Sequence, residues 1–212
     1  MLTLAACDPA TPLPPGPDPV ETTVSPTPTT APAPTAPPAL SELALSSEGM
    51  GTLRFGEAPD AAPATRMIAE DPAACSDFAP AGTPEATRWR PVALYGAPDT
   101  LLFGVSVTDG ALDRVDVFGP EIPTDAGVKI GDPAASVTAA YPAAALVESA
   151  FTDVYVVTGT LGTLQLEVAR ARAGAGYWQP AQLDHVVYLH ATIAGVGAFS
   201  VAASENIAGG CL

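Results

Sequence analysis

A Pro- and Thr-rich stretch near the N-terminus restricts what this 212-residue chain can fold into more than any other feature does. Residues 8–40 contain almost no side chain able to enter a core. Such a segment cannot bury enough apolar surface to offset the entropy lost on folding, so we expect a disordered linker. With a polyproline-like rise of about 3.1 Å per residue, it would reach at most about 100 Å. Residues 41–212 are then expected to form a single globular domain.

The residues before this linker resemble a lipoprotein signal. Leu4-Ala5-Ala6-Cys7 is similar to the lipobox of bacterial lipoproteins, in which a signal peptidase cleaves before the cysteine and the thiol carries a diacylglycerol. The resemblance implies that residues 1–7 are a signal-peptide remnant and that lipidated Cys7 holds the protein at the outer face of the bacterial cell membrane. Only six residues precede Cys7, without Lys, Arg or a full apolar segment, so we expect either that the start codon lies further upstream or that the chain has been trimmed. The alternative is an incidental cysteine in a tail.

The charge of the chain limits its partners. Eight Lys and Arg stand against 23 Asp and Glu, a formal net charge of −15. Phosphate backbones and anionic membrane surfaces would both repel such a chain. We therefore expect no nucleic-acid partner, and membrane attachment only through the lipid on Cys7.

Two further cysteines remain in the domain. Outside the cell, Cys75 and Cys211 are expected to form a disulfide. In the chain-entropy model a loop of this length stabilises the fold by about 4–5 kcal/mol. The alternative is a pair of buried free thiols in a cytoplasmic protein. No Cys or His lies at ligand spacing from either residue, so we expect no metal site.

The domain contains the same pattern twice. Leu53-Arg54-Phe55-Gly56-Glu57 is matched 75 positions later by Val128-Lys129-Ile130-Gly131-Asp132, and each motif precedes an Ala-rich stretch that predicts a short helix, over 58–69 and 133–141. Alternating segments then predict antiparallel strands, which are listed here: 88–95, 101–108 and 111–117 in the first half, and 152–158, 163–169 and 182–188 in the second. Asp109-Gly110 predicts a hairpin turn. We expect an α+β fold of two strand-helix-three-strand units, about 41–124 and 125–212, forming a largely antiparallel sheet with short helices on one face.

This tandem arrangement resembles the BamE-like and beta-lactamase-inhibitor-protein-like superfamily. The likeness covers most of residues 49–193 and concerns the fold more than the function. It implies an envelope protein that works by binding other proteins without catalysis. Units of the inhibitor type often carry a disulfide inside each repeat, whereas here one pair would close the whole domain.

The sequence contains no recognisable catalytic or cofactor motif. The two histidines, His185 and His190, are five residues apart, so on one strand they would point to opposite faces. Asp184 precedes His185, yet there is no Gly-x-Ser-x-Gly elbow. Gly195-Val196-Gly197 lacks the third glycine and the βαβ unit of a dinucleotide site. We expect no catalytic residue, cofactor or metal.

One pair of aromatic residues is a candidate for partner contact. Tyr177 and Trp178 lie in a Gly-rich segment, and loop aromatics are enriched at binding sites. The alternative is that Trp178 folds back to cap the sheet edge. The leading hypothesis is a lipid-anchored binding module that meets an envelope or extracellular protein. The alternatives are a secreted hydrolase with a site near His185 or His190, and a structural spacer of the envelope.

Overall fold

The computed structural model describes residues 36–59, 65–97, 100–174, 176–204 and 206–211. Cys7, the expected signal-peptide remnant and most of the expected linker lie outside these ranges. The described residues all belong to one compact unit. Among them, no helix is long and apolar enough to cross a membrane.

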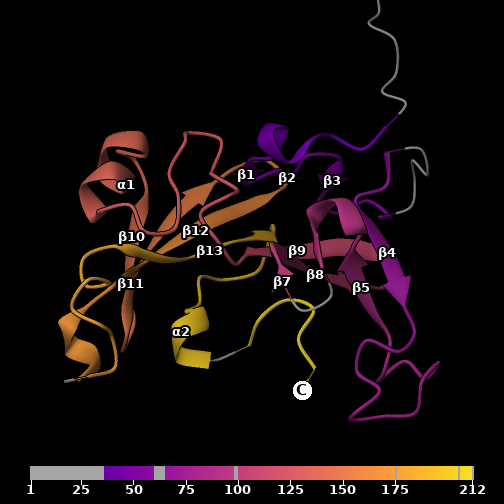
Figure 1. Ribbon diagram of the computed structural model, residues 1–212. Coiled ribbons are helices and arrows are strands. Elements are labelled where there is room, and N and C mark those ends of the chain that lie inside the picture. Colours follow the sequence, from indigo (N-terminus) through magenta and orange to yellow (C-terminus); the bar gives the residue numbers. More distant parts are fainter. Residues whose placement is uncertain (1–35, 60–64, 98–99, 175, 205, 212) are drawn as a thin grey trace, which may run out of the picture. The chain divides into compact units, whose positions relative to one another are not determined.

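Six antiparallel strands form the central sheet, in the order β10-β11-β12-β13-β9-β8 (Figure 1). Alternation of apolar and polar side chains favours these strands, and all of them except the exposed edge strand β10 contribute buried side chains. Their bounds, in the order of the chain, are β8 Phe103–Thr108, β9 Ala111–Val117, β10 Ala145–Glu148, β11 Thr152–Thr158, β12 Gly162–Ala169 and β13 Val186–Ile193. Asp109 and Gly110, with φ of 53° and 78°, make the predicted tight turn between β8 and β9. The expected α+β class with a largely antiparallel sheet is confirmed.

Smaller elements complete the described chain. Three short strands near the start form their own sheet, and two two-stranded sheets follow before the central one begins. Their bounds are η1 Leu40–Glu42, β1 Leu45–Ser46, β2 Gly49–Met50, β3 Leu53–Arg54, β4 Ile68–Asp71, β5 Arg88–Pro91, η3 Ala93–Tyr95, β6 Gly96–Ala97 and β7 Thr100–Leu101. Later elements outside the sheet are α1 Ala134–Ala140, η4 Ala171–Ala173 and α2 Val201–Ser204.

The two predicted helices had different outcomes. The second is present as α1, with Pro133 as its N-cap residue. The first was expected over 58–69, of which residues 60–64 lie outside the described chain. Its predicted end was wrong, since Ile68 and Ala69 begin β4 and pair with Pro91 and Arg90 of β5. Strand pairing here overrides the helical preference of an Ala-rich segment.

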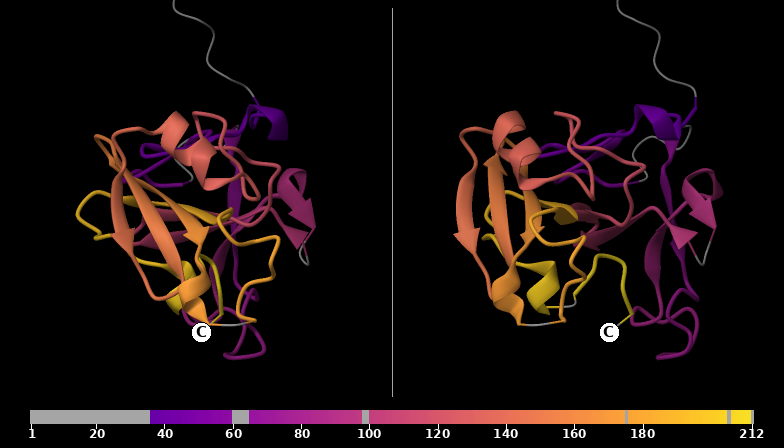
Figure 2. Two further views of the ribbon diagram at one scale, coloured as in Figure 1. Left: turned by 90° about the vertical axis from the view of Figure 1, so that its left-hand side faces the viewer. Right: turned by 60° about the vertical axis from the view of Figure 1, so that its left-hand side comes forward.

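The two faces of the central sheet are covered by different parts of the chain. On one face, apolar side chains such as Leu164, Leu166 and Leu189 pack into a core that includes residues of β1–β3 and Val137 of α1. On the other face lie α2 and the C-terminal residues. Both views of Figure 2 place α1 and the indigo β1–β3 on one side of the sheet and the yellow α2 on the other. The sheet is therefore buried on both faces over β12, β13 and β9.

Each half of the chain contains the same pair of backbone hydrogen bonds, between the repeated Gly-acid motif and the start of a strand. In each pair the glycine N–H donates to a strand carbonyl, and the N–H of that strand residue donates to the carbonyl of the acid. The pairs join Gly56 and Glu57 to Leu112 at 2.9 Å, and Gly131 and Asp132 to Val186 at 2.8 Å. Both glycines have positive φ, 81° and 94°, a conformation that glycine adopts at little cost.

Replacing Gly162 with alanine should destabilise the fold. A Cβ there would lie 2.1 Å from the Thr192 carbonyl oxygen and 2.9 Å from Phe55 Cδ2, so the backbone of β13 would have to move. We expect Gly162→Ala to lower the free energy of unfolding by about 1–3 kcal/mol, measured by urea titration. Gly197→Ala is the control, because a Cβ at that position meets nothing within 4 Å. Equal stability of the two variants would contradict the expected clash.

Candidate functional site

The two candidate contact residues lie in the connection from β12 to β13. The Tyr177 side chain packs against Phe151 with ring centroids 4.3 Å apart and meets Trp178 edge-on at 4.8 Å. Trp178 Nε1 donates a 3.0 Å hydrogen bond to the Phe151 carbonyl, and Tyr177 Oη donates to the Ala202 carbonyl at 2.9 Å. The indole is thus fixed against the turn between β10 and β11, as the edge-capping alternative expected.

Trp178 also forms a wall of a surface concavity. The concavity has a volume of about 270 Å³, and the other residues lining it come from the same connection: Ala171, Gly174, Gly176, Gln179, Pro180 and Leu183. Tyr177 beside it is 43% exposed, so an aromatic surface remains open to a partner. Capping the sheet edge and offering a contact surface are therefore compatible roles for this pair.

A network of ion pairs joins this connection to β11. Arg170 Nε lies 2.5 Å from Asp153 Oδ2, and a second Arg170 nitrogen contacts Asp184. Arg172 also binds Asp153 and donates to the Ser149 carbonyl at 2.7 Å. Burial alone would raise the pKa of Asp153, but the hydrogen bonds from Arg172 and Arg170 hold it below its usual value. The network ties the start of the aromatic connection to β11.

The second feature is a polar layer on the covered sheet face. We use this name for Gln165 and Glu167 of β12, His190 of β13, and Arg114 and Asp116 of β9. Register places Gln165, His190 and Asp116 side by side on one face. Over this layer runs the C-terminal strap, the described residues 199–204 and 206–211, which contains α2. The strap follows an exposed linker, residues 194–198.

Glu167 is the most heavily bonded member of the polar layer. Its side chain is fully buried, and Oε2 accepts hydrogen bonds from Thr152 Oγ1 at 2.7 Å and Ser200 Oγ at 2.6 Å. Oε1 accepts from the Val201 backbone N–H at 2.5 Å. Burial raises the pKa of Glu167 above its usual value, although these donors act in the opposite direction. This carboxylate joins β11, β12 and the strap.

His190 is fully buried beside Glu167. Its Nε2 lies 3.5 Å from Glu167 Oε1, and its ring meets Phe199 of the strap edge-on at 4.6 Å. Among the described residues, neither ring nitrogen has a hydrogen-bond partner. Burial, together with the charge of Arg114, lowers the pKa of His190 to about 3, so the ring is neutral at pH 7.

Arg114 and Asp116 form the other end of the polar layer. Arg114 donates to both carboxylate oxygens of Asp116, at 2.7 and 2.6 Å, in a nearly buried pair. Each partner also binds the strap backbone: Asp116 accepts from the Ala208 N–H at 2.8 Å, and Arg114 donates to the Asn206 carbonyl at 2.8 Å. Burial raises the pKa of Asp116, and the contact with Arg114 opposes this.

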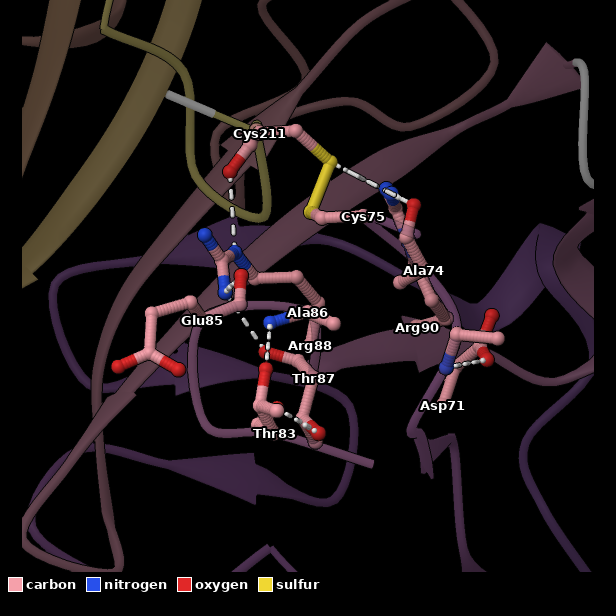
Figure 3. Close-up of a disulfide and its surroundings, with 12 residues drawn as sticks. Asp71, Ala74, Cys75, Thr83, Glu85, Ala86, Thr87, Arg88, Arg90 and Cys211 are labelled. Carbon is pink, nitrogen blue, oxygen red and sulfur yellow. Dashed lines mark hydrogen bonds between the residues drawn. A yellow bond between two sulfur atoms is a disulfide. The ribbon is translucent and has the colours of Figure 1, made fainter. Parts of the chain in front are cut away.

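A disulfide closes the end of the strap. The expected pair, Cys75 and Cys211, is bonded, with Cα atoms 5.5 Å apart and 136 positions of sequence between them. Figure 3 shows Cys211 reaching Cys75 beside Arg88 and Arg90. Arg88 Nε donates to the Gly210 carbonyl at 3.0 Å. The Cys75 N–H donates to the Ala86 carbonyl at 2.9 Å, so Cys75 is anchored within the connection from β4 to β5.

The two histidines are not brought together. His185 precedes β13, and its Nδ1 lies 2.7 Å from the Leu183 carbonyl oxygen. His190 contacts Glu167 under the strap, away from any of the described surface concavities. Within the described residues, no group of three His, Cys, Asp or Glu could hold a metal ion.

Sequence reasoning missed the polar layer. Gln165 and Glu167 alternate with Leu164 and Leu166, a pattern that normally assigns the polar side chains to solvent. The strap that buries them comes from a separate part of the chain, and only the short apolar helix α2 within it, with buried Val201, hints that it packs on something.

The burial of a neutral histidine predicts a specific loss of stability in acid. Since the pKa of His190 is about 3 in the fold and about 6.5 in the unfolded chain, the unfolded state binds the extra proton between these values. His190 therefore lowers the free energy of unfolding as pH falls from about 6.5, by up to about 1.4 kcal/mol per pH unit.

We expect His190→Leu to lack this contribution. Between pH 7 and pH 4.5, the free energy of unfolding of wild type should therefore fall by about 2–3 kcal/mol more than that of the variant, as measured by urea titration. Glu167 and Asp116 titrate in both proteins, so the comparison isolates the histidine. His185→Leu is the matched control. An identical pH dependence in wild type and His190→Leu would contradict the burial of a neutral ring.

Comparison with known proteins adds no relative: no family model, no curated protein and no solved structure matches this chain.

Proposed function

We propose that this chain is a lipid-anchored binding module of the cell envelope, without catalytic activity, which meets an envelope or extracellular protein. The observation that carries the proposal is the aromatic surface at Tyr177 and Trp178. An indole fixed by a hydrogen bond and bordering an open concavity is the kind of rigid aromatic group that dominates binding energy at protein interfaces. A structural spacer has no need of such a surface, and this favours the binding hypothesis.

The proposed location outside the cytoplasm rests on covalent chemistry. The Cys75–Cys211 disulfide is of the kind that persists in oxidising compartments. The lipobox-like Leu4-Ala5-Ala6-Cys7 and the Pro/Thr-rich residues 8–40 would supply the anchor and the tether. The domain would then be held away from the membrane surface, where a protein partner can reach the aromatic connection.

We also infer that the domain consists of two tandem units, as the resemblance to the BamE-like and beta-lactamase-inhibitor-protein-like superfamily implies. The repeated pair of backbone hydrogen bonds, at Gly56 and at Gly131, supports this. So does the order of the strands: β5 pairs with β4 and lies against β8, so that β4-β5-β8-β9 has the same order as β10-β11-β12-β13. The two units would meet where β9 pairs with β13.

The anchor is tested by the intact mass of the protein, expressed from its full upstream reading frame in a native-like host. We expect cleavage before Cys7, an added diacylglycerol, and a mass two hydrogens below that of the form treated with reductant. Cys7→Ser should abolish the lipid and leave the protein outside the membrane fraction, whereas Cys75→Ser should keep the lipid. An unmodified N-terminus with three free thiols would refute the proposed location.

The aromatic surface is tested by quantitative crosslinking to envelope proteins in the same host. We expect Trp178→Ala to reduce the yield of the specific crosslinked partner at least tenfold, because loss of an aromatic anchor typically costs 2 kcal/mol or more. Phe78→Ala is the matched control, since Phe78 is an aromatic residue that is 70% exposed on the connection from β4 to β5. Equal yields for the two variants would count against a contact at Trp178.

A further inference from the structure

The strap is bound to the polar layer through its backbone, through Ser200 Oγ, and through the ring of Phe199, which contacts His190 and Arg114. Gln165 Oε1 accepts from the Phe199 N–H at 3.1 Å, and Glu167 Oε1 accepts from the Val201 N–H at 2.5 Å. At the other end, Asp116 and Arg114 bind the backbone of residues 208 and 206. The strap residues buried against this face, Ser200, Val201, Ala202 and Ala208, all have small side chains. The face thus recognises a peptide segment by its amide groups, by the ring of Phe199 and by the smallness of the side chains that follow it.

Fold stability alone does not account for the polarity of this layer. Replacing a buried ion pair by well-packed apolar residues is often neutral or stabilising, and a buried group without a hydrogen-bond partner costs about 1–3 kcal/mol. Here Glu167 and His190 are both fully buried, and neither ring nitrogen of His190 has a partner among the described residues. Such a face resembles a binding surface that its own chain has covered.

The strap is attached in a way that permits release. The linker before it, residues 194–198, is exposed throughout, and beyond it the disulfide at Cys211 is its covalent attachment to the rest of the domain. A surface concavity of about 310 Å³ lies between Ile207 of the strap and strands β5 and β8, so solvent reaches this end of the strap although Ala208 packs closely on Gly104 of β8. Cys75 is buried, whereas Cys211 is partly exposed and open to attack.

We propose that the polar layer is a binding face for a peptide segment with one aromatic side chain followed by small ones, that the C-terminal strap occupies this face as an internal ligand, and that the Cys75–Cys211 disulfide locks it in place. The lock opens with a dithiol. Its thiolate attacks Cys211 Sγ and its second thiol resolves the mixed disulfide, so that two electrons and two protons pass to Cys75 and Cys211 while the dithiol becomes a disulfide. This face does not depend on the lipid anchor, and it meets the aromatic connection at the hydrogen bond from Tyr177 Oη to the Ala202 carbonyl.

The test uses the full chain with a site-specific protease sequence in place of residues 195–198, cut after folding. While the disulfide is intact, the strap stays attached. A labelled synthetic peptide of residues 197–210 is added in excess before a dithiol, so that the face is never left empty. We expect the labelled peptide to bind the reduced protein, measured by fluorescence anisotropy, and not the oxidised protein. The uncut reduced chain should bind far less, because its tethered strap competes at high effective concentration.

Two modified peptides test the mode of recognition without altering the protein. N-methylation at the position of Val201 removes the N–H that Glu167 accepts, and should weaken binding about ten- to a hundredfold. N-methylation at the position of Ala198, in the exposed linker, is the matched control and should change affinity less than twofold. In the protein, Glu167→Gln should weaken binding, whereas Glu148→Gln, which removes the same charge from exposed β10, should not.

Three results would overturn the proposal. The strap could stay bound after complete reduction without exchanging, which would refute the lock. The strap could leave while the labelled peptide fails to bind, which would refute the binding face. The two N-methylated peptides could bind equally, which would refute recognition through the backbone.

Discussion

A single buried carboxylate connects two strands of the central sheet with the C-terminal strap. Glu167 lies in the middle of the central sheet, yet it accepts hydrogen bonds from Thr152 on the neighbouring strand and from Ser200 and Val201 on the strap. A buried carboxylate is tolerated only when donors surround it. The strap is therefore needed to satisfy Glu167, and Glu167 in turn fixes where the strap crosses the sheet. The covering of the second face of the sheet depends on these hydrogen bonds between Glu167 and the strap.

Features set by local sequence could be predicted, because neighbouring residues determine them. The strands β9 and β11 were expected with the bounds they have, because apolar and polar side chains alternate within them and turn residues flank them. The bridge between Cys75 and Cys211 was expected from the count of cysteines together with the expected location outside the cell. Tyr177 and Trp178 were expected in a Gly-rich loop, and they lie in the connection from β12 to β13, while their role as a partner contact stays a prediction.

Features set by distant contacts could not be predicted in the same way. Ile68 lies in an Ala-rich stretch that favours a helix, but pairing with Pro91 places it in a strand. Glu167 and His190 carry the pattern of a solvent-facing surface, and their burial is caused by residues that pack on them from the strap. A sequence pattern reports which face of a strand is polar, but it does not report what will lie on that face. For this reason the polar layer emerged only with the structure.

The position of β9 beside β13 has a consequence for the way the chain folds. Arg114 pairs with Thr192, so the middle of the sheet closes only after nearly the whole domain has been made. The hairpins β8–β9 and β11–β12 join neighbouring segments and can form early, whereas pairing between distant strands is slow because the loop entropy must be lost first. During that delay β9 and β13 each present an open edge, and the β9 of one molecule has the same complementary edge available in the β13 of another. Refolding at high protein concentration would therefore favour a domain-swapped dimer, in which β9 of each copy pairs with β13 of the other. Refolding at low concentration would favour the monomer.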